Sequence, residues 1–268
     1  YFLNSDDLFH LFSYVCSGNS NPRSLSQTKT HIMKLLLISN STNPGEEYLG
    51  WPRNDIRNFL EGTGVKRILF IPYAGVSVSY DAYEAKVKAV FDQLGYDLYS
   101  IHHEADPVYA VSQAEAIAVG GGNTFHLVHE LHRTGVMQAI RGRALAGIPY
   151  MGWSAGSNVA CPSLRTTNDM PIIEPESFNC MGLVPFQINP HYLDAHPEGH
   201  GGETREQRIE EFLCINPKIY VVGLREATSL IYENGQLMLV GRHPMRVFRQ
   251  GSNPREVLPG SDVDFLMI

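Results

Sequence analysis

A serine between two glycines gives the clearest indication of chemistry in this 268-residue chain. Residues 152–156 read Gly-Trp-Ser-Ala-Gly, and they follow a run of apolar residues typical of a buried strand. A G-x-S-x-G sequence at a strand-to-helix junction is typical of a nucleophile elbow, because small residues two before and two after the serine permit the sharp turn that exposes its hydroxyl. The alternative is a turn whose serine only caps a helix. The preceding strand favours Ser154 as a nucleophile.

A second glycine-rich turn, residues 120–124 with the sequence Gly-Gly-Gly-Asn-Thr, also lies between a predicted strand and a predicted helix. Its glycines allow the backbone to approach a ligand closely. The turn does not fit the dinucleotide pattern G-x-G-x-x-G, because the last position counted from Gly120 is Phe125. It fits better as a source of a backbone N–H for an oxyanion, with a simple tight turn as the alternative.

A serine nucleophile needs a base, and His191 is the best candidate among the 11 histidines. It follows a short extended run, residues 187–190, and begins a polar loop interrupted by proline, where functional residues are often found. By contrast, His126, His129 and His132 are spaced three apart on a predicted helix and are expected on its surface. A purely structural histidine is the alternative for His191.

The same loop offers a metal site as a rival interpretation. His191, His196 and His200 could bind zinc together with Asp194 or Glu198. Neither HExxH nor another specific metal-binding spacing is present, so we expect no metal here.

Two acidic residues are candidates for the group that orients the histidine. Asp169 lies in a loop over residues 165–171. Glu226 follows a predicted strand at residues 219–224, at an edge of the sheet where active sites of such proteins form. Each could instead have a local role, Asp169 by capping a turn and Glu226 as a solvated loop residue. Their spacing in the sequence does not separate them.

From residue 33 onward, short strands alternate with longer helices. Strands are predicted over residues 34–39, 67–72, 96–101, 116–119, 148–153 and 219–224, and helices over residues 81–94, 125–133 and 203–212. This alternation predicts a three-layer α/β/α fold, in which helices cover both faces of a mostly parallel central sheet and functional groups gather at the carboxyl ends of its strands. A hairpin is predicted at 229–232 and 236–240 around Asn234-Gly235, so the sheet should end in antiparallel strands.

The composition excludes several classes of protein. With 43% hydrophobic residues the chain is too apolar to be disordered, and a net charge of −7 without a Lys/Arg run argues against nucleic-acid binding. No apolar run approaches the ~20 residues of a membrane span. The four cysteines, Cys16, Cys161, Cys180 and Cys214, form no CxxC pair, so we expect neither disulfides nor a zinc ribbon and infer a reducing compartment.

Residues 1–32 are expected to form a leader outside the fold. Their apolar residues follow Asp6 and Asp7, and no cation precedes Arg23, which is the wrong charge order for a secretory signal. Residues 33–268 contain neither an internal repeat nor a low-complexity linker. We therefore expect them to form a single domain.

Several segments together resemble peptidase E, a family of cytosolic serine peptidases that are α-aspartyl dipeptidases. The resemblance extends from Met33 to about residue 250. The segments that carry it are residues 37–42, 71–76, 120–125, 152–156, 165–171, 188–191 and 202–208. It implies a cytoplasmic protein with a fold related to class I glutamine amidotransferases, hydrolysis of dipeptides with an amino-terminal aspartate, and no metal or organic cofactor. The leader and Arg225 depart from the family pattern.

The resemblance also implies catalytic roles. Ser154 matches the nucleophile and His191 the general base. Asp169 matches the aspartate assigned as the third member of the triad, whereas Glu226 matches a glutamate considered for the same role. We prefer Asp169 and keep Glu226 as the alternative.

Further residues are implied for binding. Gly121 and Gly122, together with the Ala155 amide, would form the oxyanion hole. Asn123 and Arg205 would hold the substrate, because a bidentate guanidinium suits the aspartyl carboxylate and an amide suits the polar ends of a dipeptide.

The expected partner is therefore a small Asp-Xaa dipeptide rather than a nucleic acid or a membrane, and formation of a homodimer is left open. One alternative is a metal-dependent peptidase that uses the loop from His191 to His200. Another is a catalytically silent protein that senses acidic amino acids or peptides on the same scaffold. A cysteine amidotransferase is disfavoured, because the elbow carries Ser154 and the nearest cysteine is Cys161.

Overall fold

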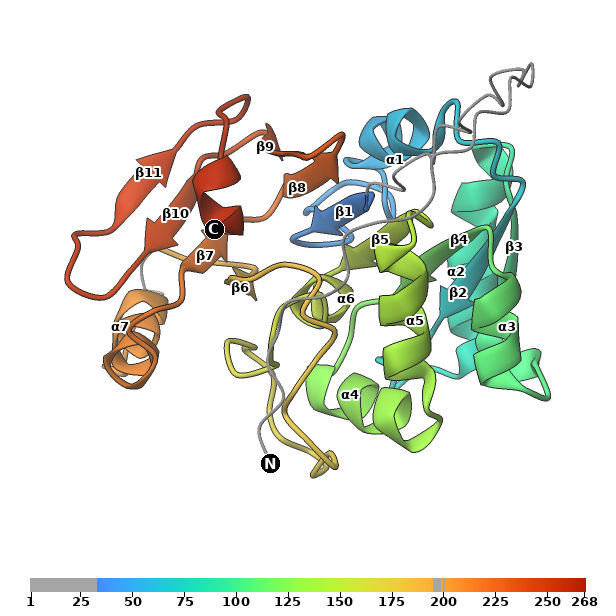
Figure 1. The fold of residues 1–268 in the computed structure, drawn as a ribbon, viewed down its shortest axis with the longest axis horizontal. Helices are drawn as coiled ribbons and strands as arrows, with labels where there is room; N and C mark the ends of the chain where they lie inside the picture. The colour runs from blue at the N-terminus through green and yellow to red at the C-terminus, as the bar shows by residue number, and fades with distance from the viewer. Residues whose placement is uncertain (1–32, 195–198, 200) are drawn as a thin grey trace, which may run out of the picture. The chain divides into compact units, whose positions relative to one another are not determined.

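A central sheet of seven strands organises the computed structural model, which describes residues 33–194, 199 and 201–268 (Figure 1). In order across the sheet, the strands are β3 (Asp97–Ser100), β2 (Arg67–Ile71), β4 (Ala116–Val119), β5 (Tyr150–Trp153), β1 (Leu35–Ile38), β8 (Thr228–Glu233) and β9 (Gln236–Gly241). The pairs from β3 to β1 are parallel, whereas β8 pairs antiparallel with β1 and with β9. The prediction of a mostly parallel sheet that ends in antiparallel strands is confirmed.

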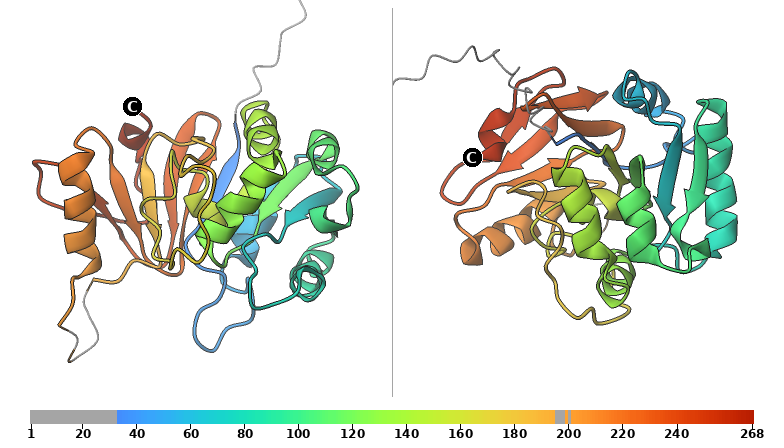
Figure 2. Two further views of the ribbon diagram at one scale, coloured as in Figure 1. Left: turned by 90° about the horizontal axis from the view of Figure 1, so that it is seen from below. Right: turned by 45° about the vertical axis from the view of Figure 1, so that its right-hand side comes forward.

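Helices cover both faces of this sheet (Figure 2). They are α1 (Arg53–Leu60), α2 (Tyr80–Gln93), α3 (Pro107–Gln113), α4 (Thr124–Arg133) and α5 (Val136–Leu145). Alternate strand residues point to opposite faces, so Leu36 and Ile68 pack with α1 and α2, whereas Leu35 and Leu69 pack with α3, α4 and α5. The three-layer fold class is therefore confirmed.

A second sheet has four strands in the order β11-β10-β7-β6. Its strands are β6 (Gln187–Pro190), β7 (Val221–Leu224), β10 (Met245–Phe248) and β11 (Arg255–Val257), and it is accompanied by α7 (Arg205–Ile215). The sequence predicts β7 as one more strand of the alternation that forms the central sheet. In the structure it pairs with β6 and β10 instead, because Val221 packs against α7 while Val222 and Leu224 face the main core.

Several elements had no prediction from the sequence: α1, α3, α5, β10, β11 and the two 3₁₀ helices η1 (Ile101–His103) and η2 (Asp264–Met267). Two of these helices, α1 with 8 residues and α3 with 7, make only about two turns, too few for a periodic apolar pattern to stand out. None of the helices within residues 33–194 and 201–268 combines the length and apolar character that crossing a bilayer requires. The leader expected at residues 1–32 lies outside the described residues.

The carboxyl ends of strands from both sheets meet where the candidate residues lie. Ser39 follows β1, Ser154 follows β5, His191 follows β6, and Glu226 comes shortly after β7. Parallel strands present their carboxyl ends at one edge, so residues far apart in the sequence come together there.

Candidate active site

Ser154 occupies a sharp turn between β5 and the short helix α6 (Ala155–Asn158). Its backbone has a φ of +53° and a ψ of −112°, a combination that non-glycine residues rarely adopt. The turn leaves no room for side chains at the two glycines of the motif. An added Cβ on Gly152 would lie 2.3 Å from the carbonyl oxygen of Gly156, and one on Gly156 would lie 2.1 Å from that of Val119. This strained, closely packed turn has the geometry of a nucleophile elbow.

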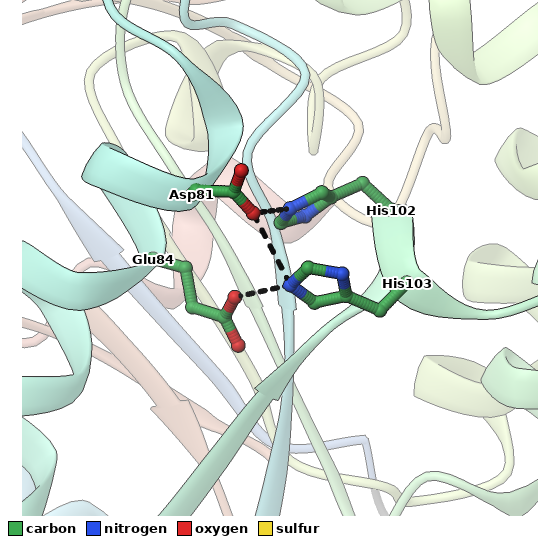
Figure 3. Close-up of side chains that lie close together, drawn as sticks. All are labelled: Asp81, Glu84, His102 and His103. Carbon is green, nitrogen blue, oxygen red and sulfur yellow. Dashed lines mark hydrogen bonds and ion pairs between the residues drawn. The ribbon is translucent and has the colours of Figure 1, made fainter.

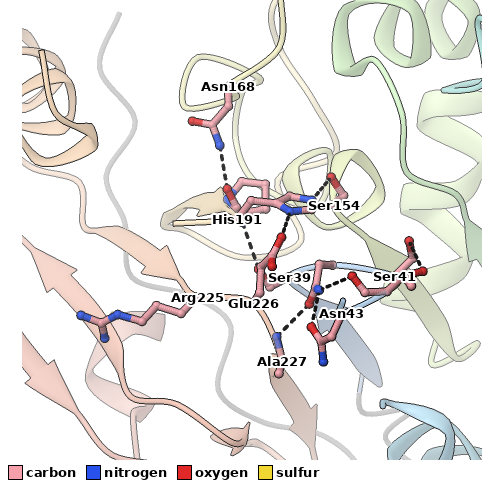
Figure 4. A network of polar contacts seen from close by, with 12 residues as sticks. Ser39, Ser41, Asn43, Ser154, Asn168, His191, Arg225, Glu226 and Ala227 are labelled. Carbon is pink, nitrogen blue, oxygen red and sulfur yellow. Dashed lines mark hydrogen bonds and ion pairs between the residues drawn. The ribbon is translucent and has the colours of Figure 1, made fainter. Parts of the chain in front are cut away.

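The Ser154 hydroxyl, the His191 ring and the Glu226 carboxylate form a continuous chain of hydrogen bonds (Figure 4). The Nε2 of His191 lies 2.9 Å from the Oγ of Ser154, and its Nδ1 lies 2.7 Å from the Oε1 of Glu226. A carboxylate can only accept, so Nδ1 donates its proton to Glu226 and Nε2 is left to accept from the serine hydroxyl. The side chains of His191 and Glu226 are 40% and 43% exposed, so substrate and water can reach them.

Two polar residues directly after β1 position the histidine and the glutamate. The Oγ of Ser39 donates to a β7 carbonyl oxygen at 2.7 Å and accepts the backbone N–H of His191 at 3.0 Å. The side-chain oxygen of Asn40 accepts the N–H of Ala227, the residue after Glu226, at 2.8 Å. Both Ser39 and Asn40 are fully buried, which strengthens these bonds. They join the central sheet to the second sheet at the candidate site.

Neither Ser39 nor Asn40 was identified as functional from the sequence; Ser39 ended the predicted strand at 34–39, and both lay in the segment 37–42 that carries the resemblance. A usable signal was present, because two polar residues directly follow a fully apolar strand, β1. In an α/β fold this is the end of the strand at which functional side chains gather.

Asp169 uses its carboxylate elsewhere, at the start of α4. Its Oδ2 accepts the backbone N–H and the hydroxyl of Thr124 at 2.7 and 2.6 Å, and it lies 3.1 Å from the hydroxyl of Thr167. The first turn of a helix has unpaired N–H groups and a positive dipole end, and a carboxylate satisfies both. The structure thus differs from the preference for Asp169, because the carboxylate that contacts His191 is that of Glu226.

The glycine turn after β4 lies against the serine. An added Cβ on Gly121 would lie 3.0 Å from the Cβ of Ser154, and Gly122 has a φ of +139°. Within the described residues, the N–H groups of Gly121 and Gly122 donate to no protein acceptor. Ala155, the first residue of α6, follows the serine directly. The turn and the Ala155 amide therefore lie on either side of Ser154, and their role as an oxyanion hole stays a prediction.

A cavity of about 620 Å³ opens beside Ser154 and His191. The glycine turn at 121–122 and Asn123 form part of its lining. Lys86, on α2, also lines the cavity, and it is the only lysine or arginine among the described lining residues. The cavity therefore brings one fixed positive charge close to the serine and histidine.

Aromatic side chains form the wall of the cavity on the α2 side. The Nζ of Lys86 lies 4.0 Å from the ring centroid of Tyr48, close enough for attraction to the ring face. The hydroxyl of Tyr83 donates to the carbonyl oxygen of Gly121 at 3.0 Å and accepts the indole N–H of Trp153 at 3.1 Å. Burial raises the pKa of Tyr83, which keeps its hydroxyl protonated. The wall thus supports both the glycine turn and the lysine.

The two residues expected to bind substrate occupy different places. Asn123 lines the cavity, and its side chain accepts the N–H of His126 at 3.0 Å and donates to the carbonyl oxygen of Met170 at 2.9 Å. Arg205 is not among the residues that line the cavity. It begins α7, and its guanidinium donates to the side chain of Asn168. Burial lowers the pKa of Arg205, but a guanidinium stays charged in proteins.

The metal site considered for the loop after β6 falls only partly within the described residues. His196, Glu198 and His200 lie outside them. Within the described part, the carboxylate of Asp194 accepts two hydrogen bonds from Arg225 and is therefore already engaged.

Cys161 does not compete with the serine as a nucleophile. It is fully buried, and burial raises the pKa of its thiol to about 12. Its Sγ accepts the backbone N–H of Ile188 at 3.2 Å. A buried, protonated thiol is inert towards substrates.

The chain is similar to known proteins over most of its length. The family described as peptidase family S51 matches residues 35–240. The chain is 53% identical to a peptidase E of Nostoc sp. over 234 residues, which cover 87% of this chain and 96% of that protein. It is 47% identical to a peptidase E of Streptomyces coelicolor over 236 residues, which cover 88% and 95%. A solved structure of a peptidase from an acI-B1 actinobacterium has the same fold, with a TM-score of 0.65 at 19% identity over 87% of this chain and 98% of that one.

Proposed function

Because the chain belongs to peptidase family S51 and is a serine-type peptidase, we propose that it hydrolyses dipeptides whose first residue is aspartate. The observation that supports this most strongly is the hydrogen-bonded chain from Ser154 through His191 to Glu226. The adjoining cavity of about 620 Å³ lies within the usual size range of small-ligand sites.

The reaction begins when the Nε2 of His191 takes the hydroxyl proton of Ser154, as the serine oxygen attacks the carbonyl carbon of the aspartyl residue. The tetrahedral intermediate collapses, the peptide bond breaks, and His191 gives its proton to the leaving amine. Water activated by the same histidine then hydrolyses the aspartyl ester and restores Ser154. Every proton in this sequence passes through His191, so no step requires a metal or an organic cofactor.

Glu226 is the third member of the triad in this proposal. Its hydrogen bond to Nδ1 fixes the tautomer of His191 and stabilises the imidazolium that forms during the reaction. Asp169 acts indirectly, because its bonds to Thr124 fix the start of α4 and with it the adjacent Asn123.

The negative charge on the reacting oxygen is stabilised by the backbone N–H groups of Gly121, Gly122 and Ala155. Such donors are effective when they are held in place before the reaction. The hydroxyl of Tyr83 supports this function by fixing the Gly121 carbonyl from behind the turn.

The two carboxylates of the substrate are recognised by different groups. Asn123 and Arg205 select the aspartyl side chain: Asn123 keeps one free N–H because its amide has two, and the Arg205 guanidinium turns from Asn168 towards the cavity when substrate binds. On the α2 side, Lys86 binds the carboxylate at the end of the dipeptide. A requirement for that carboxylate explains the restriction to dipeptides.

Substitution of the nucleophile tests the reaction. The Ser154→Ala variant is expected to hydrolyse Asp-Leu at least ~10⁴-fold more slowly than the wild type, because the acyl-enzyme can no longer form. Ser112→Ala, which changes an exposed serine on α3, is the matched control and should retain full activity. Undiminished hydrolysis by the Ser154→Ala variant would end the serine-peptidase mechanism.

Selectivity is tested by comparing Asp-Leu with Ala-Leu. The wild type is expected to prefer Asp-Leu, and Arg205→Met should reduce that preference by removing a carboxylate partner. Arg208→Met, on the exposed side of the same helix, should leave it unchanged. Equal cleavage of both peptides by the wild type would refute the proposed specificity.

The two alternatives predict different outcomes. A metal-dependent peptidase would lose its activity after exhaustive chelation. The proposed serine peptidase should keep its activity after chelation at temperatures well below its melting temperature. A silent sensor would bind Asp-Leu without turning it over.

A further inference from the structure

Four side chains of metal-binding types converge where the first turn of α2 meets the turn after β3 (Figure 3). They are Asp81, Glu84, His102 and His103, and one ligand atom of each lies within 4.8 Å of the others. The Oδ1 of Asp81 is 2.9 Å from the Nε2 of His102 and 3.4 Å from the Nε2 of His103. That second nitrogen is 2.9 Å from the Oε2 of Glu84. Two imidazole nitrogens and two carboxylate oxygens therefore face a common point.

We propose that this group, named here the His102 cluster, binds one zinc ion that joins α2 to the turn after β3. Zinc binds imidazole and carboxylate ligands at roughly 2.0–2.2 Å in a tetrahedron, which places the ligand atoms about 3.3–3.6 Å apart. Three of the six separations between the ligand atoms are 2.9, 3.4 and 2.9 Å and the other three are at most 4.8 Å, so rotation of the side chains can bring the four atoms to this geometry. Calcium and magnesium prefer oxygen ligands, so the two histidines favour zinc.

The local backbone explains why both histidines face the same way. In an extended strand, consecutive side chains point to opposite faces, but His102 and His103 lie in the 3₁₀ turn η1. Their ring centroids are 3.9 Å apart. Asp81 and Glu84 are three residues apart on α2 and therefore share one face of that helix.

A buried serine orients the ring of His102. Its Nδ1 lies 2.6 Å from the Oγ of Ser100, a residue only 1% exposed, and that Oγ lies 3.5 Å from the carbonyl oxygen of Phe70. Without a metal ion, Nε2 donates to the Asp81 carboxylate and Nδ1 accepts the Ser100 hydroxyl. When zinc takes the place of the Nε2 proton, the proton moves to Nδ1, and the Ser100 hydroxyl can accept it and turn towards the Phe70 carbonyl. The lone pair on Nε2 is then directed at the ion. Hydrogen bonding of the second ring nitrogen is the usual support of a zinc-binding histidine.

Simple ion pairing explains the cluster less well. Two imidazolium rings with centroids 3.9 Å apart would repel each other, whereas two neutral rings can share one metal ion. The side chains of His102 and Glu84 are shielded from water, at 14% and 16% exposed, whereas those of His103 and Asp81 are 55% and 76% exposed and leave an ion a path from solvent. A divalent ion would balance the two carboxylates in that setting.

A zinc ion at the His102 cluster would act on structure rather than on the chemistry of the peptide bond. Tyr83 lies between Asp81 and Glu84 in the sequence, and its hydroxyl holds the Gly121 carbonyl. Fixing the first turn of α2 would therefore steady the wall of the cavity.

The test is zinc titration of the full-length protein after removal of metals. The wild type is expected to bind one zinc ion more than the Asp81→Asn/His103→Ala variant, and its melting temperature should rise by about 5–10 °C when free zinc exceeds Kd about 100-fold. Cobalt in place of zinc should give the intense visible absorption of a tetrahedral site in the wild type only. His243→Ala, at an exposed position, should behave as the wild type.

Two further variants make the result decisive. Glu84→Gln removes one ligand with little change of shape, and circular dichroism of each variant checks its fold. His191→Ala, which changes the histidine at the candidate active site, should keep the additional zinc ion. Equal binding by the wild type and the double variant would overturn the proposal, as would loss of zinc in His191→Ala alone, because the ion would then lie at the active site.

Discussion

At the scale of single residues, two carboxylates near Ser154 are distinguished by the partners that each can reach. Glu226 leaves β7, which pairs with β6, and so it meets the ring of His191 at 2.7 Å. Asp169 lies on the α4 side, where Thr124 occupies its Oδ2 at 2.7 and 2.6 Å. Only the contact between Glu226 and His191 fixes the histidine tautomer that a general base requires.

Neutral substitution of each carboxylate separates these roles. Glu226→Gln is expected to lower kcat for Asp-Leu by ~10²- to 10⁴-fold, because the histidine loses the acceptor that fixes its tautomer. Asp169→Asn should lower kcat far less, while reducing the free energy of unfolding by ~1 kcal/mol through weaker capping of α4. Steady-state kinetics and urea unfolding measure the two effects.

The matched pair is its own control, since both variants remove one charge and preserve shape. A large fall in kcat for Asp169→Asn together with near-normal activity of Glu226→Gln would reverse the assignment. It would then restore the preference that the sequence alone favoured.

The residues that could be predicted from the sequence are those whose role depends on local backbone. Ser154 was identifiable because the elbow needs glycines two residues away on each side, and His191 because it follows an extended run into a polar loop. Glu226 could not be chosen over Asp169, because that choice depends on the pairing of β6 with β7. The roles of Ser39 and Asn40 likewise depend on a junction between two sheets.

At the scale of helices and strands, α2 supplies Lys86, the cation that we assign to the terminal carboxylate of the dipeptide. Lys86→Met is expected to raise KM for Asp-Leu by ~10- to 100-fold, because a hydrogen bond to a charged group is lost. Hydrolysis of Asp-Leu amide, which lacks the carboxylate, should change little. Comparison of KM for the two substrates in both proteins measures the effect.

Lys88→Met provides the control on the same helix. The Nζ of Lys88 lies 2.9 Å from Asp92 and 3.1 Å from Asp97, away from the cavity, and this variant should leave both KM values unchanged. An equal loss of activity on the dipeptide and its amide in Lys86→Met would contradict the assigned role.

Arg225 connects elements of the second sheet. Its guanidinium contacts Asp194 after β6 and Glu256 on β11, at 2.5 and 2.7 Å, and donates to the carbonyl oxygen of Pro244. Hydrogen bonds from Arg225 hold the pKa of Asp194 and that of Glu256 below their usual values. Arg225 thus fixes the end of β7 directly before Glu226.

This arrangement predicts a pH-dependent loss of stability in Arg225→Met. A depressed carboxyl pKa adds stability that is complete above the unfolded-state pKa, about 4, and is lost as the pH falls through the folded-state value. The two carboxylates are 50% and 44% exposed, so we expect a loss of only ~1 kcal/mol at pH 7 that shrinks below about pH 4. Urea unfolding from pH 3 to pH 7 measures it.

Arg57→Met, at an exposed position on α1, is the control and should cost little at any pH. A deficit of Arg225→Met that stayed constant down to pH 3 would show that packing, rather than ion pairing, is responsible.

Elements with strong local patterns were predictable. The apolar spacing of α2 and the uniformly apolar β4 gave bounds within one residue of those observed, Tyr80–Gln93 and Ala116–Val119. The second sheet was not predictable, because β7 looks like any central strand in the sequence. In the structure β7 pairs with β6 and β10, and Val221 of β7 and Phe248 of β10 pack with α7.

At the scale of the whole molecule, β1 is the strand on which the active site depends. It lies between the parallel β5 and the antiparallel β8, and its carboxyl end bonds to the second sheet through Ser39. The chain carries a net charge of −7. An acidic molecule gains no general attraction for an acidic dipeptide, so the proposed selectivity requires local cations such as Lys86 and Arg205.

We propose that residues 33–268 form one domain that folds without residues 1–32. A protein that begins at Met33 should melt within about 2 °C of the full chain and hydrolyse Asp-Leu at the same rate, because the leader is not expected to contribute to the core. Calorimetry and kinetics on the two proteins test this. Aggregation or a large fall in melting temperature of the shorter protein would show that the leader belongs to the fold.

The central claim is that Ser154 forms a covalent aspartyl ester during turnover. Mass spectrometry of the enzyme, acid-quenched during rapid hydrolysis of Asp-Leu and then digested, tests this directly. The proposed mechanism predicts an aspartyl adduct on the peptide that contains Ser154, and no adduct in the Ser154→Ala variant. The adduct accumulates in Glu226→Gln if that variant slows hydrolysis of the ester more than its formation. Turnover without any adduct, together with persistent activity of Ser154→Ala, would contradict it.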